Sequence, residues 1–126
     1  MPFFKIHLSD EIAEKVSPLF AHEVREVMVE TLKIDPTHGH VAVYTTPREK
    51  RSVHESRSVD FVFVELLMFS GRTDETKETL FRKLNEVVER HTGVDNKDII
   101  FNVIESDRKD WAGRGGIPMS KIHLRY

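Results

Sequence analysis

The feature that most constrains the fold is a pattern that occurs twice along the chain: a strand-like segment, then an amphipathic helix, then another strand-like segment. Residues 3–8 and 40–44 bracket the first helical pattern, and residues 59–68 and 98–104 bracket the second. Parallel strands need a long crossover connection, and such connections are almost always right-handed. The sequence therefore predicts an α/β (α+β) fold, in which tandem β-α-β units form a four-stranded mixed sheet with two helices on one face.

Both helices are marked by capping residues and by apolar side chains at helical spacing. Ser17 followed by Pro18 predicts the start of the first helix, which runs to about Leu32. Thr73, followed by two acids, predicts the start of the second, and Gly93 supplies its left-handed end. The apolar side chains lie on one face of each helix, which we expect to pack on the sheet: Phe20, Val24, Val27 and Met28, then Leu80, Leu84, Val87, Val88 and His91.

Length and composition limit the classes of protein to consider. A chain of 126 residues suits one domain, so we expect a single domain of two halves, about 1–58 and 59–126. With 39% apolar and 32% charged residues, we expect neither disorder nor a membrane partner. The lack of cysteine excludes disulfides and thiolate chemistry, and no secretion signal is seen, which favours a cytoplasmic protein. The net charge of -2 argues against nucleic acid as a partner.

The segment 59–68 also predicts an oligomer. It is almost continuously apolar, as in a strand covered on both faces, whereas the helices cover only one face of the sheet. We therefore expect a partner chain on the other face. The tail 117–126 contains Lys121-Ile122-His123-Leu124, which repeats Lys5-Ile6-His7-Leu8. It is interpreted either as a strand that pairs across a subunit boundary or as a chance repeat.

Pro2 is the first candidate for catalysis. Removal of Met1 would turn Pro2 into a secondary amine at the end of a strand, and an α-amino group titrates near neutral pH. Burial and nearby cations would lower its pKa further, so that it could take a proton from carbon. The alternative is a proline that merely begins an edge strand, where its missing N–H costs nothing.

Two further stretches carry candidate ligand-binding residues. Arg72 lies between a strand and a helix, where it could hold a carboxylate, or it pairs with the acids that follow it. The stretch Asp110-Trp111-Ala112-Gly113-Arg114-Gly115-Gly116 could form a flap that brings an aromatic wall and a cation to a pocket. Alternatively, Trp111 anchors a bulge in the core.

The remaining polar clusters are weaker candidates. His38 and His40 could lie on one side of a strand, but no third ligand completes a metal site, so His40 is interpreted as a polar pocket wall. The segment 48–57 is interpreted as a solvated charged loop. Neither a Ser-His-Asp grouping nor a Gly-rich phosphate loop is present in the sequence.

Taken together, Pro2, the helix start Phe69-Ser70-Gly71-Arg72-Thr73-Asp74-Glu75-Thr76-Lys77 and the segment 110–116 resemble the tautomerase superfamily. The likeness is to its long-chain members of fused double length, which include malonate semialdehyde decarboxylase. It implies a duplicated β-α-β fold, a homotrimer, an amino-terminal proline as the base, and roles for Arg72 and Trp111 in the pocket. Three positions depart from the pattern, and they argue against carrying over decarboxylation or a diacid substrate: His38 in place of an aspartate, Ser70 in place of a second arginine, and Ile100 in place of a substrate-binding arginine.

The leading hypothesis is a cofactor-independent keto-enol tautomerase acting on a small 2-oxo acid. Pro2 would shuttle the proton, Arg72 or Arg114 would hold the carboxylate, and Trp111 and Phe3 would exclude water. A second hypothesis is decarboxylation or hydration of a 3-oxo or unsaturated acid, with a protonated proline and His38 or His40. A third is a trimeric binding module without catalysis.

Overall fold

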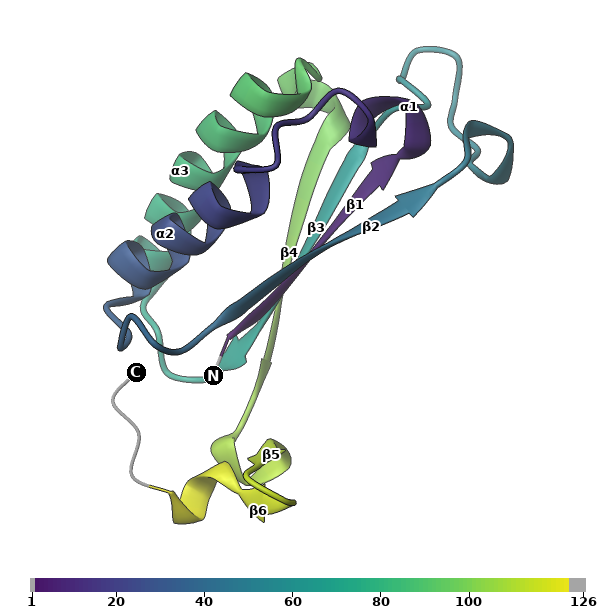
Figure 1. Ribbon diagram of the computed structural model, residues 1–126. Coiled ribbons are helices and arrows are strands. Elements are labelled where there is room, and N and C mark those ends of the chain that lie inside the picture. Colours follow the sequence, from purple (N-terminus) through teal and green to yellow (C-terminus); the bar gives the residue numbers. More distant parts are fainter. Residues whose placement is uncertain (1, 123–126) are drawn as a thin grey trace.

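The computed structural model describes residues 2–122 (Figure 1). Two long helices lie on one side of a sheet, and a small hairpin follows the last long strand. The helices are α1 Asp10–Ala13, α2 Phe20–Leu32 and α3 Asp74–Thr92. The strands are β1 Phe3–Ser9, β2 His40–Thr46, β3 Val62–Phe69, β4 Ile99–Ser106, β5 Ala112–Gly113 and β6 Ile117–Pro118.

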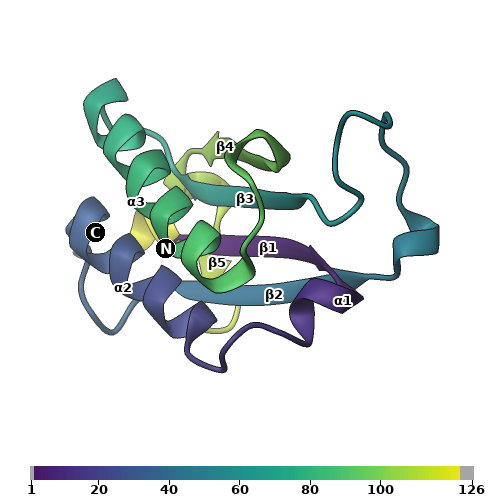
Figure 2. The same cartoon turned by 90° about the horizontal axis from the view of Figure 1, so that it is seen from above.

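The main sheet has the strand order β2-β1-β3-β4 (Figure 2). β1 runs parallel to β2 and β3 runs parallel to β4, as the two β-α-β units predict. The two units meet through β1 and β3, which are antiparallel, with Phe3 opposite Leu67. As a consequence, β1 and β2 begin, and β3 and β4 finish, at the same end of the sheet. We call this end the Pro2 edge, after the residue that precedes β1.

The core lies between the sheet and the two long helices. Alternate residues of β1 and β3 are buried, and so is one face of each helix, as the spacing predicts. The largest core side chains that are less than 2% exposed are Phe4, Phe20, Ile6, Leu8, Met28, Leu66, Met68, Leu80 and Leu84. This packing fixes which face each strand residue presents.

The predicted capping residues are confirmed except at the start of α2. Thr73 accepts a hydrogen bond from Thr76 N, and Gly93 has a left-handed φ of 70°. α2 begins at Phe20 rather than directly after Ser17, because the Ser17 hydroxyl accepts a hydrogen bond from Leu19 N at 3.0 Å and closes a turn first.

The face of the sheet away from the helices, which we call the open face, is less apolar than predicted. Glu65 lies at its centre, where its carboxylate is 2.7 Å from His7 Nε2. The His7 ring stacks on Tyr44 on one side and on Phe63 on the other. β3 is a central strand, as predicted, and its open-face positions Phe63, Leu67 and Phe69 are apolar. Glu65 is the charged exception on that face.

The tail also differs from the prediction. Ile117–Pro118 pairs with β5, but Met119–Lys121 forms a 3-10 turn, so an extended strand over these residues is wrong. The rest of the predicted strand, 123–126, lies outside the described residues. Within 2–122, none of the helices has the length and apolar character needed to cross a membrane.

Candidate functional site

Pro2 and Arg72 come from different halves of the chain, and the antiparallel pairing of β1 with β3 brings them to the same edge. Pro2 is buried, and its carbonyl accepts a hydrogen bond from His40 N at 3.0 Å, which fixes it against the start of β2. Pro2 shares the strand parity of Phe4, so it lies on the helix side of the sheet. Arg72 follows the end of β3, after Gly71 with a φ of 115°.

The Arg72 guanidinium is partly buried and has spare hydrogen-bonding capacity. Its Nη1 donates to Phe69 O at 3.4 Å, and among residues 2–122 it makes no other hydrogen bond. Burial lowers the pKa of Arg72 below its usual value, and the nearby Glu105 carboxylate opposes this shift. Glu105 is itself paired with Lys77 Nζ at 2.7 Å. Arg72 therefore offers donors that match a carboxylate.

The alternative interpretation of Arg72, an ion pair with the acids after it, is not what the described chain adopts. Within 2–122, neither Asp74 nor Glu75 lies within ion-pair distance of its guanidinium. A hollow of about 190 Å³ instead lies beside Arg72, bounded also by Leu32, Ser70 and Gly71. Ligand pockets usually have ~300–1,000 Å³, so this hollow alone suits only a very small molecule.

Trp111 is held at the Pro2 edge by two contacts. Its indole Nε1 donates to Ser106 Oγ at 2.7 Å, and its ring packs edge-on against Phe69 at 5.6 Å between centroids. Its carbonyl accepts from Met119 N, which ties the β5–β6 hairpin back to it. Trp111 thus anchors the hairpin to the ends of β3 and β4, which fits the anchor interpretation and leaves the aromatic wall a proposal.

The other candidate residues are spread around this edge. Arg114 is exposed at the hairpin tip with a φ of 48°, and its guanidinium has no partner among the described residues. Phe3 and His40 pack edge to face at 6.0 Å and share the open-face parity, on the side of the sheet opposite to Pro2. The structure therefore brings Pro2 and Arg72 to the same end of the sheet. Phe3, His40 and Arg114 lie around this end without forming a single cluster with them.

Arg25 on α2 is a residue of this edge that the sequence interpretation missed. Its guanidinium donates to Gly39 O at 3.0 Å, to His38 O at 2.7 Å and to Pro36 O. These bonds fix the loop that leads into β2. They thereby hold His40, whose backbone N–H donates to the Pro2 carbonyl. In the sequence, an arginine on the polar face of an amphipathic helix is typical of a solvated residue, so nothing in the pattern predicts that Arg25 holds backbone carbonyls.

Two arginines tie the exposed segment 48–57 to the residues before β3. Arg48 forms a two-pronged ion pair with Asp60, and Arg51 donates to the carbonyls of Val59 and Phe61. Arg48, with burial opposing it, holds the pKa of the Asp60 carboxyl below its usual value. Residues 48–50 and 52–57 are exposed, as predicted for a solvated charged loop, whereas Arg51 is partly buried and holds two backbone carbonyls.

Comparison with known proteins places this geometry in context. A family model described as tautomerase enzyme matches residues 43–114, more than half of the chain. A fused 4-OT solved as a symmetric trimer is 14% identical, covers 94% of this chain and 98% of its own, and has a TM-score of 0.84. FG41 malonate semialdehyde decarboxylase inhibited by 3-bromopropiolate is 22% identical over 90% and 91% of the two chains, with a TM-score of 0.72.

A third solved structure, a macrophage migration inhibitory factor-like protein from Entamoeba histolytica, is 21% identical over 89% and 94% of the chains, with a TM-score of 0.70. The curated proteins contain no match to the sequence. At these identities the solved structures establish the fold, and the family model establishes the family.

Proposed function

Since this chain belongs to the tautomerase enzyme family, we propose that it interconverts the keto and enol forms of a small 2-oxo acid, with Pro2 as the base after removal of Met1. The observation that supports the proposal is the shared end of the sheet: a buried Pro2 precedes β1 there, and a partly buried Arg72 with unused donors follows β3 there. A base and a carboxylate-binding cation are the two groups that this reaction needs.

In the proposed reaction, Pro2 nitrogen takes the proton from the carbon next to the ketone, and the C–H bonding electrons form the enolate. The protonated proline then gives the proton to the enolate oxygen, so the amine is regenerated and no cofactor is needed. Arg72 holds the carboxylate and so orients the carbon acid toward the base. A low-dielectric surrounding favours the neutral amine over the charged ammonium, so the Pro2 nitrogen stays unprotonated near neutral pH and can accept a proton.

We further propose that the active form is a homotrimer. The fused 4-OT is described as a symmetric trimer, and its fold covers nearly all of this chain. The open face here carries exposed apolar side chains, Ile100 at 55% and Ile104 at 40%, around the His7 and Glu65 pair. A partner chain on this face would cover them and could add walls to the small hollow beside Arg72. Sedimentation velocity tests this, and a monomer at micromolar concentration would contradict it.

Decarboxylation or hydration of a 3-oxo or unsaturated acid is the second candidate. It is favoured by the fold likeness to malonate semialdehyde decarboxylase and by the imidazole of His40 at the Pro2 edge. A protonated Pro2 would then act as an acid rather than a base. Carbon dioxide release from malonate semialdehyde, compared with ketonisation of phenylenolpyruvate, decides between the two candidates.

The test of the leading proposal is the substitution Pro2→Ala. A positioned general base contributes ~10²- to 10⁴-fold, so kcat/KM for phenylenolpyruvate should fall by about that factor. Intact mass must first show that Met1 has been removed, because a retained Met1 makes Pro2 nitrogen an amide without basicity. An unchanged rate in a Pro2→Ala protein of correct mass would refute the role of Pro2.

A further inference from the structure

One carboxylate, that of Glu105, lies close to two cations at the Pro2 edge, Arg72 and Lys77. Arg72 precedes α3, and Lys77 is the fourth residue of that helix. Glu105 lies near the end of β4 and shares the strand parity of Phe101, whose ring packs against Phe81 of α3. The Glu105 side chain is therefore on the side of the sheet that faces α3, away from the open face.

The backbone holds Arg72 beside this carboxylate. Ser70 N donates to Ser106 O at 3.1 Å, which ties the segment between β3 and α3 to the residue after Glu105. On the same segment, the Arg72 guanidinium donates to Phe69 O at 3.4 Å. Burial lowers the pKa of Arg72, and the Glu105 charge is close enough to oppose that shift. Arg72 and Glu105 are thus neighbours.

Glu105 is nevertheless paired with Lys77 and not with Arg72. Lys77 Nζ lies 2.7 Å from Glu105 Oε1, and the two side chains are 23% and 27% exposed. Within 2–122, no Glu105 oxygen lies within ion-pair distance of the Arg72 guanidinium. Partly buried ion pairs are screened less by salt than exposed ones, so Lys77 is well placed to hold this carboxylate.

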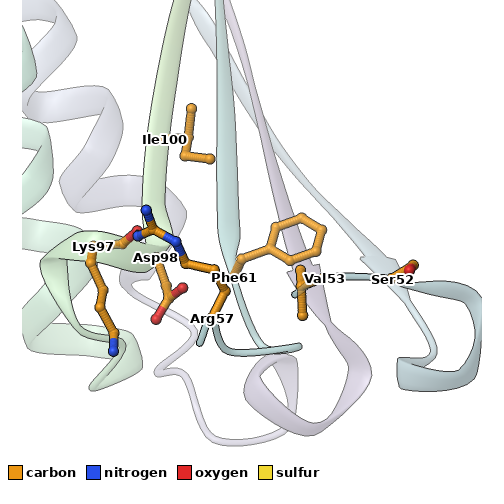
Figure 3. A pocket seen from close by; sticks show the side chains of 7 residues that line it. All are labelled: Ser52, Val53, Arg57, Phe61, Lys97, Asp98 and Ile100. Atoms are coloured by element: carbon orange, nitrogen blue, oxygen red, sulfur yellow. The ribbon is translucent and has the colours of Figure 1, made fainter. Parts of the chain in front are cut away.

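The opposite end of the sheet shows the other possible arrangement of two cations and an acid. A cavity of about 400 Å³ there is lined in part by Arg57, Lys97 and Asp98. The Asp98 carboxylate lies between the Arg57 guanidinium and the Lys97 ammonium, which points away from Arg57 (Figure 3). An acid of the chain that lies between two cations offsets the charge of both. At the Pro2 edge, by contrast, Arg72 keeps its unused donors.

We propose that Lys77 is a positioning residue, which keeps Arg72 available to substrate by holding Glu105. This inference rests on the proposed function, in which Arg72 binds the substrate carboxylate. Without Lys77, Glu105 would lose its partner at a partly buried place, which is unfavourable for a charge. The Arg72 guanidinium has the fork of donors that suits a carboxylate, so Glu105 would turn to it and compete with the substrate. In this role Lys77 need not touch the substrate.

The binding test uses phenylglyoxylate, a 2-oxo acid with no hydrogen on the carbon next to its ketone, which Pro2 therefore cannot enolise. In isothermal titration calorimetry, Lys77→Met should raise the Kd at least about fivefold, the effect of one competing ion pair. Lys77→Arg keeps a cation for Glu105 and should restore tight binding. With phenylenolpyruvate, Lys77→Met should raise KM and leave kcat unchanged, because competition for Arg72 affects the bound substrate and the transition state alike.

A second substitution separates competition from a merely structural ion pair. Glutamine carries no charge to compete for Arg72, so Glu105→Gln combined with Lys77→Met should return the Kd to within about twofold of wild type. If the ion pair only stabilised the fold, the double variant would bind as weakly as Lys77→Met. Lys83→Met is the matched control, because it also removes an α3 lysine that is paired with an acid, Glu30 at 3.2 Å. It changes the net charge equally and should leave the Kd unchanged.

A measurement without ligand distinguishes this inference from the proposed function. In a crystal structure of Lys77→Met, a Glu105 oxygen should lie within hydrogen-bond distance of the Arg72 guanidinium. A Glu105 side chain that stays away from Arg72, or a double variant that binds as weakly as Lys77→Met, would overturn the inference. If Glu105 moves to Arg72 but Arg72→Met binds phenylglyoxylate as tightly as wild type, the hold of Lys77 on Glu105 stands and the proposed role of Arg72 is wrong.

Discussion

Replacement of Arg25 by methionine should loosen the loop that supports the Pro2 edge. Methionine keeps much of the apolar stem of the side chain but removes three hydrogen bonds from the guanidinium, to the carbonyls of Pro36, His38 and Gly39. A hydrogen bond from a charged group contributes ~1.5–3 kcal/mol when buried. These carbonyls are partly accessible to water after the change, so we expect a total loss of about 2 kcal/mol.

Urea-induced unfolding followed by circular dichroism measures this loss. Wild type and variant must be compared at the same protomer concentration, because oligomer stability depends on concentration. Arg82→Met is the matched control: Arg82 is an exposed arginine on α3 with no side-chain hydrogen bond to the described residues, and its replacement should change stability by less than about 0.5 kcal/mol.

The same substitution also tests how the site is positioned. His40 N holds the Pro2 carbonyl at 3.0 Å, and His40 follows directly on the loop that Arg25 fixes. If the loop moves, Pro2 loses its alignment, so kcat/KM for phenylenolpyruvate should fall although Arg25 touches no substrate. A destabilisation below about 0.5 kcal/mol, or no difference from Arg82→Met in either assay, would refute this account of the loop.

Three further predictions concern stability, each measured by urea unfolding. Leu66→Ala, at a position with no exposed surface, should cost about 2–5 kcal/mol through lost burial and a residual cavity. Gly39→Ala should cost more than Gly93→Ala, because both have a positive φ but only Gly39 would place its Cβ against a core methionine. Arg48 lowers the pKa of Asp60, so the stability that this carboxylate adds is present above its unfolded pKa of about 3.9 and is lost as the pH falls below it. The stability difference between wild type and Asp60→Asn should therefore shrink between about pH 5 and pH 3.

The sequence predicted the units of the fold because local patterns determine them. The period of apolar side chains and the capping residues Thr73 and Gly93 depend only on nearby positions, and the crossover rule then requires parallel strands within each unit. The charged pair in the middle of the open face was not predicted, because segment 59–68 is almost continuously apolar and a single acid within it does not specify its partner. Strand parity places Glu65 beside His7 on that face.

The candidate site was only partly predictable. Pro2 and Arg72 were chosen for their chemistry, but their common edge depends on the antiparallel pairing of the two units, which no local pattern specifies. The role of Trp111 as an anchor requires Ser106 and Phe69 to be its neighbours, and these contacts arise only when the hairpin folds back. Residues whose function is to hold backbone carbonyls, such as Arg25, carry no mark in the sequence.

The internal repeat explains why only one of the two units can hold a proline base. Duplication of a β-α-β unit gives two equivalent places, but a chain has only one amino terminus, so a proline amine can exist only in the first unit. The second unit has Phe61 at the equivalent place, with its amide already hydrogen-bonded and Arg51 stacked on its ring.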